Sequence, residues 1–238
     1  MIESKVYHLL EGAKKARGTA VIIDVFRAFS LECYLYGMGA RLIRPVGSVE
    51  EAWALHEKIP GSVLIGERHG IRCDGFDFGN SPYQVSLKEE SIRDRIVIHT
   101  TSAGTQGIVN ASGADEILTG SFLNARAIAE YISSSYSAGP RPISLVAMGL
   151  SARENTDEDE LCAEYIQALL RGEELPDLEE KLDALRYTSG ARFFKPELAE
   201  HFPKEDFDMC IRHDIFPFVL RIGKDELGYF SERIDVIK

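Results

Sequence analysis

The stretch IVIHTTSAGTQG, residues 96–107, begins like a buried strand and ends in a row of small polar residues. Ile96 to His99 are typical of a strand, whereas the six residues 100–105 are all small and four of them carry hydroxyl groups. A short apolar run followed by a polar, glycine-containing cluster and a helical pattern is typical of one strand–loop–helix unit of an α/β protein. The rest of the chain shows whether the unit is repeated.

Six units of this kind follow one another between residues 18 and 171. After residue 120, for example, Phe122, Ala125, Ala129 and Ile132 share one face at helical spacing. The apolar runs are residues 18–25, 41–46, 62–68, 95–101, 115–120 and 142–149. We therefore predict an α/β fold with a largely parallel sheet and helices on both of its faces.

The C-terminal part of the chain has a different pattern. Pro and Gly interrupt short helices there, and residues 216–223 and 228–238 resemble closing strands, expected to pair antiparallel at an edge of the sheet. The length is compatible with a single α/β domain over residues 1–238. The serine-rich stretch 133–142 is expected to be a surface loop, and a subdivision of the domain would fall there.

Charge and composition exclude several classes of partner. The chain has 38 acidic and 27 basic residues, a net charge of −11, which argues against nucleic acid or an anionic membrane. The four cysteines are scattered without a CxxC pair, which disfavours a zinc site or a disulfide framework. The N-terminus lacks a signal-peptide pattern and every apolar run is too short to span a bilayer, so we expect a soluble, cytoplasmic protein.

Chemically active residues gather where the predicted strands end. In an open α/β sheet, ligands bind outside the carboxyl ends of the strands. The candidates at these positions are Asp24, Arg27, Ser30, Glu67, Arg68, Asp77, Asn80, Thr100, Thr101, Ser102, Gly104, Thr105 and Asp159.

The hydroxyl row at residues 100–105 has two interpretations. One Ser or Thr would be enough to cap the following helix. Four hydroxyl groups exceed that need, and together with the free N–H groups of a helix start they favour binding of a phosphate or sulfonate. Arg27 is either a surface residue in a first helical turn, where its charge opposes the helix dipole, or a bidentate clamp on an oxyanion, which we favour.

Four carboxylates are candidates for a metal site. Asp24, Glu67 and Asp77 lie at or just beyond strand ends, whereas Asp159 lies in the acidic start of a helix, where capping is the alternative role. Carboxylates that converge from separate loops suit Mg²⁺, which takes one or two of them and completes its shell with water and substrate oxygens. We predict that Mg²⁺ binds some of these four.

Signatures of other enzyme classes are absent. The sequence contains no GxxxxGK[ST], GxGxxG, HExxH or GxSxG motif, and no Cys followed six positions later by Arg. Nucleotide, dinucleotide, zinc-protease, serine-hydrolase and cysteine-phosphatase functions therefore lose their main support.

Five motifs in chain order resemble the 2-phosphosulfolactate phosphatase family. They are VIIDVFRAFS, GERHGIRCDGFDFGNSP, HTTSAGT, GSFLNARAIA and EDELCAEYI, within about residues 19–170, and FDMCIRHDIFPFVLRI is more weakly similar. The resemblance implies an α/β fold with helices flanking the sheet. It also implies a cytosolic, Mg²⁺-dependent phosphatase that converts phosphosulfolactate to sulfolactate and phosphate in coenzyme M synthesis.

The family motifs fall on identifiable positions of this chain. Carried over by position, they fall on Asp24, Arg27, Ala28, Ser30 and Glu67, and on residues 75–82, 100–105 and 158–163. The chain departs from the family pattern at two positions. Ala103 stands where the hydroxyl loop has asparagine, and Glu164 stands where a glycine follows Cys-Ala.

These observations give one hypothesis and two alternatives. The hypothesis is a phosphatase with Asp24, Arg27, Glu67 and Asp159 as catalytic residues and with Mg²⁺ on Asp24, Glu67, Asp77 and Asp159. The predicted contacts to a small anionic phosphorylated substrate are Ser30, Arg68, Asn80, Thr100, Thr101, Ser102, Gly104 and Thr105. The alternatives are a phosphatase for another small phosphorylated carboxylic acid and a non-catalytic anion binder, and a homo-oligomer is compatible with all three.

Overall fold

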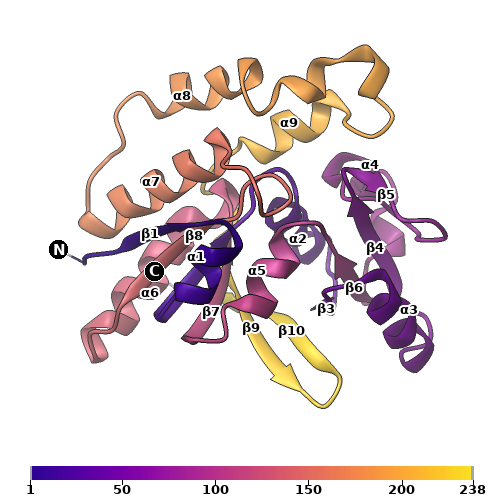
Figure 1. Cartoon of the computed structure of the whole chain (residues 1–238), viewed down its shortest axis with the longest axis horizontal. Helices are drawn as coiled ribbons and strands as arrows, with labels where there is room; N and C mark the ends of the chain where they lie inside the picture. The colour runs from indigo at the N-terminus through magenta and orange to yellow at the C-terminus, as the bar shows by residue number, and fades with distance from the viewer. Residues whose placement is uncertain (1, 237–238) are drawn as a thin grey trace.

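The computed structural model describes residues 2–236, which form a ten-stranded mixed sheet flanked by helices (Figure 1). The strands are β1 (Lys5–His8), β2 (Gly18–Ile23), β3 (Leu42–Pro45), β4 (Val63–Arg68), β5 (Ile71–Arg72), β6 (Ile96–Thr100), β7 (Ala114–Gly120), β8 (Ile143–Ala147), β9 (Phe218–Asp225) and β10 (Gly228–Asp235). Their order in the sheet is β1-β8-β2-β7-β9-β10-β3-β6-β4-β5. The pairs β1–β8, β8–β2, β2–β7, β3–β6 and β6–β4 are parallel, which confirms the largely parallel sheet.

Helices connect most of the strands. They are α1 (Leu9–Lys15), α2 (Ala28–Gly37), α3 (Val49–Lys58), α4 (Pro82–Ser86), α5 (Gly104–Asn110), α6 (Ala125–Ala138), α7 (Asp157–Arg171), α8 (Leu178–Ala184) and α9 (Lys204–Cys210). Short 3-10 turns are η1 (Glu89–Ser91), η2 (Phe122–Asn124), η3 (Leu185–Tyr187), η4 (Ala191–Phe194) and η5 (Pro196–Leu198).

Strand β2 shows why helices cover both faces of the sheet. Every residue of β2 is buried, and successive side chains of a strand point to opposite faces. Val21 and Ile23 pack in one core cluster with residues of α6 and α7, whereas Ala20 and Ile22 pack in another with residues of α1 and α5. A strand without a polar face needs an apolar layer on each side, as predicted.

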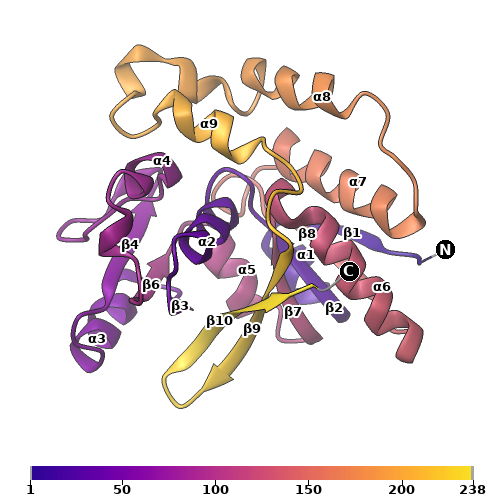
Figure 2. The same cartoon turned by 180° about the vertical axis from the view of Figure 1, so that it is seen from behind.

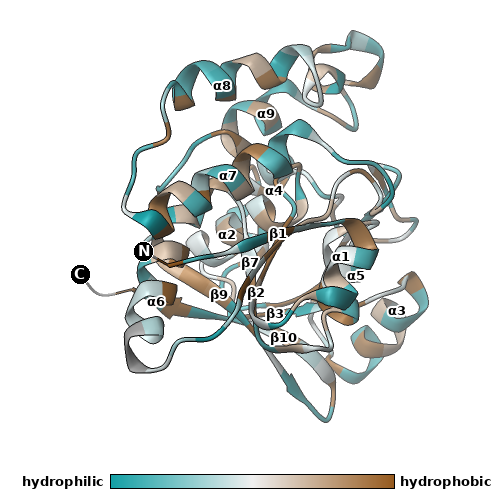
Figure 3. Cartoon of the chain, turned by 60° about the vertical axis from the view of Figure 1, so that its left-hand side comes forward, coloured by the Kyte–Doolittle hydropathy of each residue, from teal (hydrophilic) through white to brown (hydrophobic). Residues whose placement is uncertain are grey.

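The other half of the sheet follows the same rule. In β4, Val63 and Ile65 pack with residues of α2, and Leu64 packs with Ala52 and Leu55 of α3. Figure 3 shows hydrophobic residues gathered on the central strands and hydrophilic residues on α8 at the outside. Among the described residues, no helix is long and apolar enough to cross a lipid bilayer.

The two C-terminal strands form an antiparallel hairpin, as predicted, but their position differs from the predicted edge. β9 pairs with β7, and β10 pairs with β3 through Ser231 and Ile43, so the hairpin lies inside the sheet and joins its two halves. Only the start of β9, residues 218–220, is fully buried, and the hairpin tip is exposed.

The predicted loop at residues 133–142 is mostly helical. α6 extends to Ala138, and only residues 139–142 lie outside regular structure. Tyr136 packs against the same core cluster as Ile132, one turn earlier. This packing extends the helix through a serine-rich sequence whose composition indicated a loop.

A helical segment covers the carboxyl ends of the strands. Residues 178–210 run from α8 to α9 and form the top layer in Figures 1 and 2. Within this segment η4 packs against α9, and α9 packs against α4. The segment therefore closes over the edge of the sheet where the predicted site residues lie.

Candidate active site

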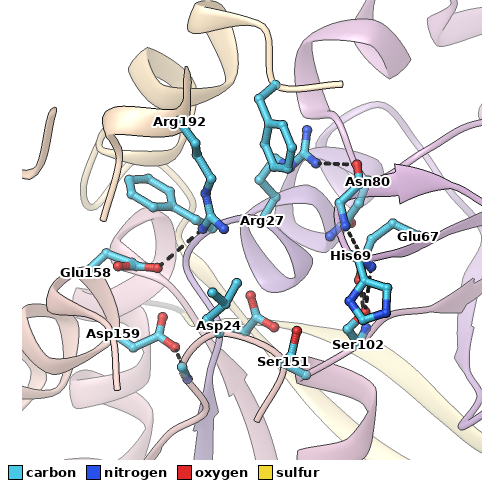
Figure 4. Close-up of a pocket in the computed structure, with 16 residues that line it drawn as sticks. Asp24, Arg27, Glu67, His69, Asn80, Ser102, Ser151, Glu158, Asp159 and Arg192 are labelled. Atoms are coloured by element: carbon cyan, nitrogen blue, oxygen red, sulfur yellow. Dashed lines mark hydrogen bonds and ion pairs between the residues drawn. The ribbon is translucent and has the colours of Figure 1, made fainter. Parts of the chain in front are cut away.

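A pocket of 270 Å³ opens at the carboxyl ends of β2, β4, β6 and β8, beneath the segment 178–210 (Figure 4). Its lining residues are Asp24, Phe26, Arg27, Glu67, His69, Gly70, Asn80, Ser102, Ala103, Gly149, Leu150, Ser151, Glu158, Asp159, Arg192 and Phe202. The predicted residues that it brings together are Asp24, Arg27, Glu67, Asn80, Ser102 and Asp159. The predicted residues outside its lining are Ser30, Arg68, Asp77, Thr100, Thr101, Gly104 and Thr105.

Asp24 follows β2 at the floor of the pocket. Its Oδ1 accepts a hydrogen bond of 3.2 Å from the N–H of Ala28 at the start of α2. Burial, and in smaller measure the charges of Glu67 and Glu158, raise the pKa of Asp24 to about 7. The Asp24 carboxyl group therefore exchanges a proton near neutral pH, where an ordinary aspartate is ionised.

Glu67 holds two loops together at one wall of the pocket. Its Oε2 accepts from the N–H of Gly70 at 2.6 Å, and its Oε1 accepts from the N–H of Ser102 at 2.7 Å. The Ser102 hydroxyl donates to Oε2 at 3.2 Å. The carboxylate thus joins the loop after β4 to the loop after β6.

Asp159 likewise holds two segments together, at the wall of the pocket opposite Glu67. Its Oδ1 accepts from the N–H of Val25 and its Oδ2 from the N–H of Gly149, both at 2.8 Å. Burial raises the pKa of Asp159, and the charges of Glu158 and Asp24 raise it further. Asp159 therefore bridges the ends of β2 and β8, and it does not cap its own helix α7 as the alternative interpretation proposed.

Arg27 lines the pocket but is engaged by the protein. Its Nη1 donates to Oδ2 of Asp206 at 2.7 Å and to the carbonyl of His201 at 2.8 Å, and its Nη2 donates to the carbonyl of Gly70 at 3.3 Å. Asp206 is fully buried, and Arg27 is 3% exposed. The guanidinium therefore ties α2 to the segment 178–210, and much of its capacity for a clamp on an oxyanion is already used.

Arg192 supplies the second positive charge of the pocket, and it is not among the residues predicted from the sequence. Its Nη2 lies 4.0 Å from Oε1 of Glu158. Its guanidinium lies over the rings of Phe193 and Phe202, with distances of 5.6 and 5.5 Å to the ring centroids. Nothing in the local sequence indicates that this arginine reaches a pocket formed by distant strand ends.

The hydroxyl row is used mainly within its own loop. The N–H of Thr101 donates to Oγ1 of Thr105, and the N–H of Thr105 donates to Oγ1 of Thr101, each at 3.2 Å. Oγ1 of Thr100 accepts from Nη2 of Arg68 at 3.0 Å. Only Ser102 of the four hydroxylic residues lines the pocket. The surplus of hydroxyl groups is therefore explained by hydrogen bonds within and beside the loop, and only Ser102 remains of the predicted anion-binding hydroxyl groups.

Asn80 reaches the pocket with a buried network behind it. Its Oδ1 lies 3.1 Å from Nε2 of His99, whose Nδ1 lies 2.9 Å from Oε1 of Glu32. His99 and Glu32 are fully buried. This chain of contacts fixes the amide of Asn80 at the wall. Ser30, by contrast, is fully buried in α2 and outside the lining.

Asp77, the fourth predicted metal ligand, lies elsewhere. It is exposed, its Oδ2 accepts from the N–H of Leu64 at 2.8 Å, and it lines a different surface pocket. Its carboxylate fixes the end of the glycine-rich loop against β4. Asp77 therefore supports the wall of the site from outside.

The remaining carboxylates are a suitable but incomplete donor set for Mg²⁺. Across residues 2–236, no three His, Cys, Asp or Glu side chains are grouped so that they could hold an ion by themselves. Oε2 of Glu158 is buried without a hydrogen-bond partner among these residues, and Asp24 and Asp159 have raised pKa values. The counter-charge nearest to Glu158 is Arg192, at the long distance of 4.0 Å. Because Mg²⁺ needs only one or two carboxylates, the pocket fits this ion together with a substrate oxygen.

Comparison with known proteins identifies the family. The chain matches the family model described as 2-phosphosulpholactate phosphatase over residues 6–225. A "Probable 2-phosphosulfolactate phosphatase" from Caldicellulosiruptor saccharolyticus is 39% identical over 184 residues, 76% of this chain and 73% of the relative. Relatives of the same name from Clostridium perfringens and Bacillus subtilis are 30% and 29% identical, over 91% and 86% of this chain and 91% and 87% of the relatives. Every residue of the pocket lies within the span that the family model matches, and the chain belongs to the 2-phosphosulfolactate phosphatase family.

Proposed function

We propose that the chain is a Mg²⁺-dependent phosphatase that hydrolyses 2-phosphosulfolactate to sulfolactate and phosphate. The observation that carries the proposal is the convergence of Asp24, Glu67, Glu158, Asp159 and Arg192 on one pocket at the strand ends. The name of the relatives supplies the substrate. The resemblance noted in the sequence adds coenzyme M synthesis as the pathway.

The chemistry demands charge stabilisation and proton transfer. Hydrolysis of phosphate monoesters is among the slowest uncatalysed reactions, with enzymatic accelerations up to ~10²¹. A group that titrates near the working pH is best suited to proton transfer. With a pKa of about 7, Asp24 takes a proton from the attacking water and returns one to the leaving oxygen.

The other carboxylates position the site. Glu67 and Asp159 hold the loops around Asp24 by their hydrogen bonds to backbone N–H groups. Glu67, Asp159 and the adjacent Glu158 would hold Mg²⁺, which leaves Asp24 for proton transfer. When bound, the ion supplies positive charge for the phosphoryl oxygens, which is the main requirement of the transition state.

Phosphate release from 2-phosphosulfolactate tests this proposal. The wild type is compared with and without EDTA, beside Asp24→Asn. Asp77→Asn is the matched control, because Asp77 is another predicted metal ligand of the same residue type but lies outside the pocket. We expect metal-dependent release that falls at least ~10²-fold in Asp24→Asn and is retained in Asp77→Asn. Undiminished release in EDTA would contradict the metal requirement, and equal losses in both variants would contradict the assigned site.

A second substrate is favoured by one observation. Ala103 lines the pocket where the family pattern has asparagine. The other departure, Glu164, lies on the outside of α7, where its Oε1 is 3.3 Å from Nζ of Lys181. Only Ala103 therefore bears on the substrate. Higher kcat/KM for another phosphorylated carboxylic acid in the same assay would favour that substrate over 2-phosphosulfolactate.

A further inference from the structure

The two arginines of the pocket differ in how much of their hydrogen-bonding capacity the protein already uses. Arg27 donates to a carboxylate and to two carbonyl groups at 2.7 to 3.3 Å. Arg192 has one ion-pair contact at 4.0 Å, to Glu158, and its Nε is buried without a hydrogen-bond partner among the described residues. The guanidinium of Arg192 is thus the one that retains unused donors in a site built for an anion.

The protein holds Arg192 in place without neutralising it closely. The rings of Phe193 and Phe202 lie beside its guanidinium, and cation–π contacts of this kind fix the plane of an arginine. The Arg192 side chain is 21% exposed. A planar guanidinium held by aromatic rings, with free donors facing a pocket, is suited to bidentate binding of an acid group.

The position of Arg192 separates it from the reacting centre. It extends from η4 in the upper wall, above Glu158, whereas Glu67 and Ser102 form the opposite wall and Asp24 lies between them (Figure 4). A phosphoryl group beside Asp24 leaves the rest of the substrate free to extend toward Arg192. Other arginines near the site are unsuitable. Arg68 is bonded to Glu67 and Thr100 outside the lining, and Arg153 is exposed and also outside it.

We propose that Arg192 binds one of the two acid groups that the substrate carries besides its phosphate, the sulfonate or the carboxylate, and so selects phosphate esters that carry such a group. The proposal rests on the phosphatase function proposed above. Arg192 is then a specificity residue that contributes mainly to KM, whereas Asp24 determines kcat. Glu158 pairs with Arg192 at long range before the substrate arrives, and it keeps the guanidinium directed into the pocket.

The test compares two substrates in three variants of the full chain with Mg²⁺. The substrates are 2-phosphosulfolactate and glycerol 2-phosphate, which has no second acid group. The variants are Arg192→Gln, Arg192→Lys and the matched control Arg186→Gln. Arg186 lies in the same segment and over the rings of Phe194 and Phe207, but outside the pocket.

We expect Arg192→Gln to raise KM for 2-phosphosulfolactate about 10- to 100-fold, because the substrate loses one charged bidentate contact. The same variant should change kcat/KM for glycerol 2-phosphate less than about threefold. Arg192→Lys keeps the positive charge but cannot make two parallel hydrogen bonds to one acid group. Its KM for 2-phosphosulfolactate should therefore lie between those of the wild type and Arg192→Gln. Equal losses on both substrates would overturn the proposal, because Arg192 would then bind the phosphoryl group or only support the fold. Inhibition by inorganic phosphate should be unchanged in Arg192→Gln, and a matching loss there would also overturn it.

A binding measurement separates this proposal from the phosphatase function. Calorimetric titration with sulfolactate does not require turnover, so it tests Arg192 even in a chain that hydrolyses neither substrate. Binding retained in Arg186→Gln and lost in Arg192→Gln supports the acid subsite. Binding that is equal in the two variants, or absent in the wild type, rejects it whatever the outcome of the activity assay.

Discussion

At the scale of single residues, position 104 has no room for a side chain larger than that of glycine, because Asp24 and Ala28 lie beside it. A Cβ at position 104 would lie 2.9 Å from both Oδ2 of Asp24 and Cβ of Ala28. We expect Gly104→Ala to cost about 1–3 kcal/mol of stability, as overpacking does, and to lower kcat/KM at least ~10-fold by moving Asp24. Denaturant unfolding and phosphate release measure the two effects. Gly139→Ala is the control, because nothing lies within 4 Å of its added Cβ, and the same losses there would refute the argument.

The raised pKa of Asp24 makes a second prediction at this scale. The folded state holds a proton on Asp24 up to a pH of about 7, whereas the unfolded chain releases it near 3.8. The folded state therefore loses stability as the pH rises from about 4 to 7, by up to about 4 kcal/mol. Asp24→Asn removes this loss, so in EDTA it should be more stable than the wild type at pH 8.

The difference in stability between Asp24→Asn and the wild type should depend on pH. The advantage of Asp24→Asn should grow by about 2 kcal/mol between pH 5.5 and pH 8. Urea unfolding at the two pH values gives both numbers. An advantage that is constant with pH would show that Asp24 titrates like an ordinary aspartate and would weaken its proposed role in proton transfer.

Single residues also show what a sequence can and cannot predict about a site. Asp24 and Glu67 are predictable because a carboxylate directly after an apolar strand has few structural reasons to be there. Asp159 is ambiguous, since acidic residues are common in a first helical turn, and only its bonds to Val25 and Gly149 decide its role. Arg192 could not be predicted, because its neighbours in the pocket come from elements far away in the chain.

At the scale of elements, α9 connects the segment 178–210 to α2 and α4 through one carboxylate. Asp206 accepts from Arg27, from the hydroxyl of Ser81 at 2.8 Å and from the N–H of Tyr83 at 2.9 Å. Asp206→Ala leaves the charge of Arg27 buried and unpaired, and we expect it to cost about 3–5 kcal/mol. Chemical denaturation measures the loss. Asp208→Ala is the matched control on the exposed face of α9, and comparable losses in both variants would contradict this role.

Elements also differ in how well the sequence predicts them. Strands that are buried on both faces, such as β2, are recognised by their continuous apolar runs, and their parallel pairing follows from the helices between them. The sequence predicts β9 and β10 as closing antiparallel strands at an edge, whereas they lie inside the sheet, because strand position depends on partners that local sequence does not reveal. The end of α6 was missed because the packing of Tyr136 outweighs a serine-rich composition.

At the scale of the whole molecule, the pocket spans the two halves that the hairpin joins. Asp24 and Asp159 belong to the half that contains β2 and β8, whereas Glu67 and Ser102 belong to the half that contains β4 and β6. The raised pKa of Asp24 depends in part on Glu67, so the chemistry of the site requires both halves. An active enzyme therefore needs the halves to fold as one unit.

If the two halves of the sheet fold as one unit, the protein should unfold in a single transition. The only tryptophan, Trp53, lies in α3 and reports on one half, whereas far-UV circular dichroism reports on both. If the sheet is one cooperative domain, the two signals should give the same urea midpoint and slope, as expected for two-state unfolding. Loss of phosphatase activity should follow the same curve. A fluorescence transition that is displaced from the circular dichroism transition would show that the halves unfold separately, with the β9–β10 hairpin as the boundary between them.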